Sequence, residues 1–181
     1  MKITILAVGK IKEKYLATGI AEFTKRLTPY AKLNIIEVDE EKMPENPSDA
    51  EKEKVLTKEG EKLLKYLDPN SYLIVLDVFG KQGSSEELAE KIDKLGLDGK
   101  SHITFLIGGA FGLSQQVRQT AKEKLSFSKM TFTHQMIRLL LVEQIYRAFK
   151  ISRGEKYLNR AEEYKNELNL SSDSSSENSA S

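Results

Sequence analysis

Short apolar runs alternate with segments of helical pattern along the first 150 residues of this chain. The apolar runs lie at 3–9, 32–38, 71–78, 103–108 and 125–130, and the helical patterns at 13–27, 48–67, 85–95, 114–123 and 134–151. This alternation is typical of a parallel sheet with helices on both faces. The third and fourth runs are apolar at nearly every position, as strands covered on both faces are. We therefore predict an α/β fold.

Two of the predicted helices begin with a capping box. In the segments from Ser48 to Glu51 and from Ser84 to Glu87, a serine is followed three residues later by a glutamate. The hydroxyl and the carboxylate can satisfy free N–H groups of the first helical turn. Both helix starts are thus predicted from local chemistry.

Composition narrows the classes of site that the chain can carry. The chain has 181 residues, of which 39% are apolar and 30% charged, as is ordinary for a soluble globular domain. The absence of cysteine excludes disulfides, zinc–thiolate sites and cysteine nucleophiles. With His102 and His134 as the only imidazoles, we expect no metal site. Neither a secretory signal nor a membrane-spanning run is evident, so we expect a cytoplasmic protein.

Charge is unevenly distributed, although the chain as a whole is nearly neutral. Residues 118–160 carry ten basic side chains and three acidic ones, whereas residues 37–53 are mostly acidic. A basic region of this kind can serve an anionic partner. The same charge distribution is also expected if these basic residues simply lie on helix faces exposed to solvent.

The helical pattern at 134–151 is apolar on nearly every side. A helix at the end of a domain normally keeps one polar face. Its absence indicates either that a second subunit covers the helix, in a homodimer, or that the helix lies deep in the centre of one domain.

Candidate site residues follow the third, fourth and fifth apolar runs, because ligands of α/β proteins bind at the carboxyl ends of strands. Glycines at 108, 109 and 112 allow close backbone approach, although a plain tight turn explains them as well. His134 and Arg138 are one helical turn apart and are expected on one side of the last helix. Taken alone, His134 is more often a capping or core residue than a catalyst.

Four segments in one order carry a family resemblance. They are ITILAVGKIKEKY, LIVLDVFGK, FLIGGAFGLS and LSFSKMTFTHQMIRLLLVEQIYRAFKI. Over residues 1–157 the chain resembles the ribosomal RNA large subunit methyltransferase H family, small members of the SPOUT (α/β-knot) methyltransferases. The resemblance implies one SPOUT domain over 1–157, with a parallel sheet and a C-terminal trefoil knot.

The resemblance also implies an activity and its partners. Family members are homodimers that transfer a methyl group from S-adenosylmethionine to N3 of a pseudouridine in large-subunit (23S) ribosomal RNA, on assembled ribosomes. It assigns cofactor contacts to Leu76, Gly108, Phe127, Ser128, Lys129, Met130, Thr131 and Phe132. Catalytic or substrate-positioning roles fall to His134, as a proton-accepting base or a positioning group, to Arg138 at the cleft mouth, which would place a phosphate or nucleobase, and to Tyr157.

The chain departs from the family pattern at its C-terminus. Family members end in tyrosine, histidine and a basic residue, whereas Tyr157 is followed here by Leu158 and Asn159, with Arg160 one position later. Residues 158–181 form an extension, and 171–181 are expected to be disordered because they are acidic and of low complexity. Smaller departures are Ala110-Phe111 in the glycine loop and Thr133, where proline is common.

The altered tail leaves a second function class open. A binding module could retain the cofactor and the ribosome while catalysis is impaired. A flavodoxin-like nucleotide protein is a third hypothesis, which flavin absorbance in the purified protein would support.

Overall fold

The computed structural model describes residues 1–157 of the chain. Strands and helices alternate in the order β1 (Lys2–Val8), α1 (Lys14–Leu27), β2 (Lys32–Val38), α2 (Asp49–Tyr66), β3 (Tyr72–Gln82), α3 (Ser85–Leu97), β4 (His102–Ile107), α4 (Gln115–Thr120), β5 (Glu123–Ser126) and α5 (Met136–Ser152). The strands form a sheet in the order β2-β1-β4-β3-β5, and every neighbouring pair is parallel. The predicted α/β fold with a parallel sheet is confirmed.

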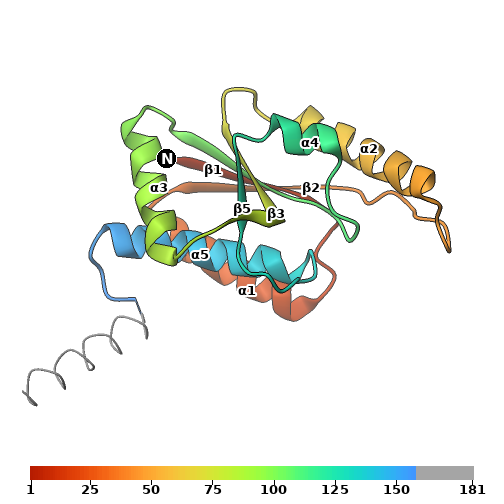
Figure 1. The fold of residues 1–181 in the computed structure, drawn as a ribbon. Coiled ribbons are helices and arrows are strands. Elements are labelled where there is room, and N and C mark those ends of the chain that lie inside the picture. Colours follow the sequence, from red (N-terminus) through yellow and green to blue (C-terminus); the bar gives the residue numbers. More distant parts are fainter. Residues whose placement is uncertain (158–181) are drawn as a thin grey trace, which may run out of the picture.

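The sheet separates two apolar cores (Figure 1). Helices α1, α3 and α5 cover one face, where Ile3 and Ile5 of β1 point, and α2 and α4 cover the other, where Leu6 and Val8 point. This division follows from the two-residue period of a strand, which sends successive side chains to opposite faces. In β1 and β4 the set that faces α1, α3 and α5 is wholly apolar, whereas the other set is apolar only toward the carboxyl end, at Leu6, Val8 and Leu106, and contains the buried Thr4 and Thr104.

Both predicted capping boxes are present. The Ser48 hydroxyl accepts a hydrogen bond from the backbone N–H of Glu51, and the Glu51 carboxylate accepts one from the N–H of Ser48. Ser84 and Glu87 repeat the arrangement at the start of α3.

The fifth strand is shorter than predicted. Strand β5 ends at Ser126, and the residues between 127 and 133, predicted in part as strand, form a loop. The Ser126 hydroxyl donates to the Ser128 carbonyl at 2.9 Å, and the Ser128 hydroxyl accepts from the Met130 N–H at 3.0 Å. These local bonds satisfy backbone groups that a strand would pair with its neighbour, so the chain leaves the sheet.

Helix α5 lies in the centre of the helical layer. It packs against α1 on one side and α3 on the other, and against the sheet. No side chain between His134 and Ile151 is more than partly exposed. Burial within a single chain therefore accounts for the apolar pattern of this helix, and the homodimer stays a prediction.

Candidate functional site

A cavity of about 910 Å³ lies at the carboxyl ends of β4 and β5 and beside the middle of β3, where the pairing of β3 with β5 changes register between Leu76 and Lys81. Three segments supply most of its lining, namely 76–78 in β3, 107–113 after β4 and 125–135 around the end of β5, and the start of α1 closes one side. These segments are far apart in the sequence, but parallel strands bring their carboxyl ends to one edge of the sheet. The volume is within the range of roughly 300–1,000 Å³ usual for small-molecule sites.

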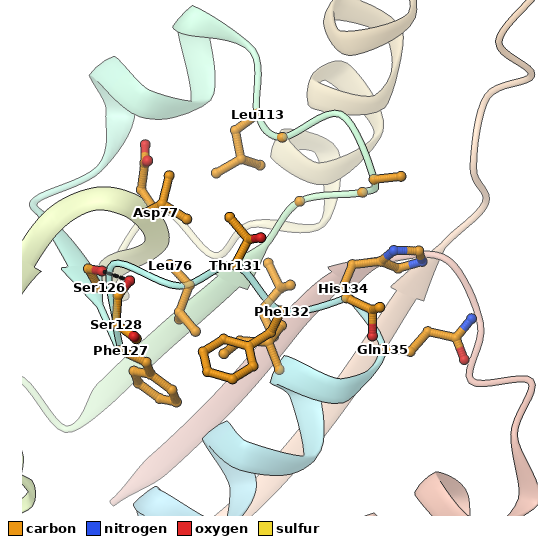
Figure 2. Close-up of a pocket in the computed structure, with 18 of the residues that line it drawn as sticks. Leu76, Asp77, Leu113, Ser126, Phe127, Ser128, Thr131, Phe132, His134 and Gln135 are labelled. Carbon is orange, nitrogen blue, oxygen red and sulfur yellow. Dashed lines mark hydrogen bonds between the residues drawn. The ribbon is translucent and has the colours of Figure 1, made fainter.

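Most of the predicted cofactor contacts line this cavity. Figure 2 shows Leu76, Thr131 and Phe132 around one space, with Ser126, Phe127 and Ser128 beside it. The lining residues among the predicted contacts are Leu76, Gly108, Phe127, Ser128, Met130, Thr131 and Phe132. Lys129 is the exception, because its exposed side chain does not contribute to the cavity wall. Met130 is 78% exposed and thus belongs to the mouth rather than to an inner wall.

The glycine loop after β4 approaches itself closely. The N–H of Gly112 donates to the carbonyl of Gly109 at 3.1 Å, and Gly112 has a φ of +91°, which favours glycine. A β-carbon at Gly108 would lie 2.5 Å from the Gly112 carbonyl oxygen and 2.8 Å from Cδ2 of Leu113. The loop therefore keeps its shape, and the cavity its wall, only while position 108 carries no side chain.

For S-adenosylmethionine, the cofactor that the family resemblance implies, the affinity is expected to fall roughly ten- to a hundredfold when Gly108 is replaced by alanine. Overpacking against backbone costs about 1–3 kcal/mol, and the displaced loop lines the cavity. Calorimetric titration would measure the loss. Gly96→Ala in α3 is the control, because its new β-carbon meets only the flexible end of Met1, at 3.3 Å. Unchanged affinity in Gly108→Ala would show that this loop takes no part in binding.

A charged pair in the cavity wall was not predicted from the sequence. The Asp77 side chain, 4% exposed, accepts a hydrogen bond from the Phe79 N–H at 3.0 Å, and Nε of Arg118 lies 3.3 Å from its other oxygen. This pair joins the middle of β3 to α4 and places a carboxylate and a guanidinium at the cavity. The sequence feature that could have indicated Asp77 is its position, since it is the first charged residue after the apolar run that begins at Leu73.

His134 and Arg138 lie in different surroundings. His134 lines the cavity, at the opposite end from Ser126 in Figure 2. Arg138 is fully buried, and its guanidinium donates to the Glu37 carboxylate at 2.6 Å and to the carbonyls of Val8 and Gly9 at 3.2 and 3.0 Å. The expectation that Arg138 stands at the cleft mouth is therefore wrong. The side chain instead ties α5 to the end of β1, because an unpaired buried cation would be too costly.

Tyr157 packs against α5 and does not line the cavity of its own chain. Its hydroxyl donates to the Glu143 carboxylate at 2.8 Å, and the guanidinium of Arg147 lies 4.5 Å from its ring centre. Burial, followed by the bond to Glu143, raises the pKa of Tyr157 to about 12. Leu158, Asn159 and Arg160, like the predicted disordered segment 171–181, lie outside the described residues.

Glu59 is a buried carboxylate behind the glycine loop. It is 5% exposed, it accepts a hydrogen bond from the Glu41 N–H at 3.1 Å, and it borders the space where a β-carbon of Gly109 would lie. Burial raises the pKa of Glu59, and the negative charge of Glu40 adds to this. A raised pKa means that the ionised form is less favourable in the folded chain than in the unfolded one.

Replacing Glu59 by glutamine is therefore expected to raise the free energy of unfolding at neutral pH. The contribution of the native carboxyl to stability is fully present below its unfolded-state pKa and is lost as the pH rises through the higher folded-state pKa. Glutamine retains an oxygen for the Glu41 N–H and carries no charge. Urea unfolding at pH 7.5 and pH 4 would show a gain at the higher pH that shrinks at the lower one. Glu61→Gln on the exposed face of α2 is the control. A gain independent of pH would contradict the interpretation.

Two further properties concern the described residues as a whole. None of the helices within 1–157 is long and apolar enough to cross a membrane. Over the same residues, His, Cys, Asp and Glu side chains nowhere gather in a group of three or more that could hold a metal ion.

Comparison with known proteins gives matches over the same stretch that the structure describes. The model of a family described as "Predicted SPOUT methyltransferase" matches residues 1–157. The chain is 63% identical over 157 residues to the ribosomal RNA large subunit methyltransferase H of Halothermothrix orenii, covering 87% of this chain and 99% of that protein. The protein of the same name from Carboxydothermus hydrogenoformans is 59% identical over 157 residues, which again cover 87% of this chain and 99% of that protein.

Proposed function

Because this chain belongs to the SPOUT methyltransferase family, we propose that it methylates ribosomal RNA with S-adenosylmethionine as methyl donor. The observation that carries the proposal is the match to relatives of that name over 157 residues. The cavity lies within the matched residues, at the strand ends where a small ligand of an α/β protein is expected.

The residues of the cavity fit this cofactor in size and chemistry. Leu76, Ile107 and Leu125 provide apolar walls suited to an adenine ring, and the tight loop at Gly108 leaves backbone groups accessible. Asp77 and Arg118 provide one negative and one positive group for a zwitterionic amino-acid moiety. When bound, S-adenosylmethionine supplies an electrophilic methyl group, so no metal is required.

The protein residues then have two tasks. The cavity wall orients the reacting groups, and orientation alone contributes several kcal/mol to catalysis. His134 accepts a proton from the nucleotide that is methylated, or positions that nucleotide. Arg138 acts from the core as a positioning residue, since it fixes the start of α5 directly after His134.

The finer assignments extend the proposal. We infer that the methylated atom is N3 of a pseudouridine and that the substrate is the assembled ribosome in the cytoplasm. The exposed basic residues within 118–160, such as Lys122, Lys124 and Lys129, would supply salt-dependent affinity for RNA, whereas the buried Arg138 would not. The C-terminal segment is proposed to form a trefoil knot, and two copies to form a homodimer in which Tyr157 serves the site of the partner subunit.

Transfer of labelled methyl groups tests the proposal. Ribosomes that lack the modification would be incubated with the protein and labelled S-adenosylmethionine, with isolated RNA as control. Label in the large-subunit RNA is the expected result. Absence of label together with absence of cofactor binding at millimolar concentration, which corresponds to about −4 kcal/mol, would overturn it.

A second candidate function is supported by Leu158 and Asn159, which replace the histidine and the basic residue of the family's tail. Under this alternative the chain binds cofactor and ribosome but transfers methyl groups poorly. The double variant Leu158→His/Asn159→Arg separates the two functions. A large gain in rate would favour the binding module, and an unchanged, substantial rate would favour the active enzyme.

A further inference from the structure

The acidic segment that begins at the end of β2 borders the candidate site. Its first glutamates each have a different basic partner: Glu37 pairs with Arg138 at 2.6 Å, Glu40 with His134 at 2.9 Å, and Glu41 with Lys62 at 2.7 Å. The charge asymmetry noted in the sequence thus brings carboxylates to a site proposed to bind an anion. Such a placement calls for a reason other than affinity for RNA.

Glu40 is the glutamate next to the cavity-lining histidine. Oxygen Oε1 of Glu40 lies 2.9 Å from Nε2 of His134, and Nε2 is buried and makes no hydrogen bond within the described chain, so the contact with Glu40 is one of charge at close range. Two lone pairs facing each other at this distance would repel, whereas an N–H on Nε2 would be attracted to the carboxylate. The contact therefore favours a proton on Nε2.

The fold holds Glu40 in this position. Gly9 has a φ of +85°, and a β-carbon there would lie 2.6 Å from Oε1 of Glu40, so the glycine leaves room for the carboxylate. On either side the segment is anchored: Glu37 accepts from the Ile11 N–H at 3.0 Å, and the N–H of Glu41 donates to Glu59 at 3.1 Å. Glu40 is thereby directed at the imidazole although 40% of its side chain is exposed.

We propose that Glu40 is a positioning residue that holds His134 in the Nε2–H tautomer and leaves Nδ1 as the free proton acceptor. In a neutral imidazole only one nitrogen carries a proton, so the partner of one nitrogen decides the chemistry of the other. One part of this inference, the use of Nδ1 as proton acceptor during methyl transfer, rests on the proposed function. The tautomer itself is a property of the protein without ligand.

The test uses the two histidines of the chain. Imidazole ¹⁵N spectra of the full-length protein, recorded at a pH where both rings are neutral, report the tautomer of His134, with His102 as internal reference. Glu40→Gln removes the carboxylate charge and keeps the shape. Glu45→Gln, on an exposed glutamate of the same acidic segment, is the matched control. In Glu40→Gln the ratio of the two His134 tautomers is expected to shift at least about fivefold, since a negative charge 2.9 Å from Nε2 is replaced by a neutral amide.

Methyl transfer provides the second measurement. The turnover number of Glu40→Gln is expected to fall about tenfold with an unchanged KM for S-adenosylmethionine, because the nitrogen that accepts the proton is affected and the cofactor walls are not. Unchanged His134 signals in a folded Glu40→Gln protein would overturn the proposal, as would a changed tautomer with an unaltered turnover number. Absence of transfer by the unsubstituted protein would count against the proposed function, whereas the spectra would still decide the role of Glu40.

Discussion

Replacing His134 by glutamine is expected to lower the rate of methyl transfer about a hundredfold or more and to change affinity for S-adenosylmethionine less than about threefold. A positioned acid–base group contributes roughly 10²–10⁴-fold to a reaction. His134 is the only histidine of the cavity wall and lies at the opposite end from Phe127 and Ser128, which are proposed to contact the cofactor. Single-turnover transfer and calorimetric titration would separate the effect on rate from the effect on binding.

The other histidine of the chain supplies the control. His102 stands at the amino end of β4, where its ring nitrogens lie 2.9 Å from the Thr4 hydroxyl and 3.2 Å from the Asp68 carboxylate. His102→Gln is expected to keep the transfer rate of the folded protein. If His134→Gln kept it as well, His134 would be a structural residue, and the proton would have another acceptor.

Replacing Arg138 by methionine is expected to lower the free energy of unfolding by about 3–5 kcal/mol. The guanidinium is fully buried, and its loss leaves the carbonyls of Val8 and Gly9 without a donor and Glu37 without its cation. Breaking a buried ion pair costs about this much because the remaining partner is uncompensated. Glu37 is 33% exposed and partly hydrated, so the lower end of the range is expected. Urea unfolding would measure the loss.

An exposed ion pair provides the comparison. Arg26 bonds to Glu22 at 2.9 Å on the surface of α1, and Arg26→Met is expected to change the free energy of unfolding far less than Arg138→Met, because solvent screens an exposed pair. If Arg138→Met were equally mild but weakened binding to ribosomes, Arg138 would be a substrate contact, as the family resemblance suggested, and not a residue of the core.

Most elements of this fold could be predicted because their causes are local. The apolar runs at 71–78 and 103–108 overlap the observed strands β3 (Tyr72–Gln82) and β4 (His102–Ile107). The capping boxes at Ser48 and Ser84 start their helices as predicted. The prediction failed at the fifth strand. There an apolar alternation competes with hydroxyl–backbone bonds at Ser126 and Ser128, and the bonds end the strand.

The candidate site was predictable only in part. The three glycines at 108, 109 and 112 and the run from Phe127 to Phe132 were found because they follow strands, and all of these residues except Lys129 line the cavity. The pair of Asp77 with Arg118 was missed, and Arg138 was assigned to the wrong environment. Helical spacing places Arg138 near His134 but cannot show whether the side chain points to solvent or to the core.

The sequence by itself determined the α/β class, the order of the elements and the family, because periodicity, capping and motif order are properties of neighbouring residues. The tertiary structure alone decided which charges meet. Strand β1 lies between β2 and β4, and this order brings Val8 and Glu37 to Arg138, and Glu40 to His134. The partners are about a hundred positions apart in the chain. Whether a charge is catalytic or structural depends on such long-range partners and on burial, and no local pattern records either.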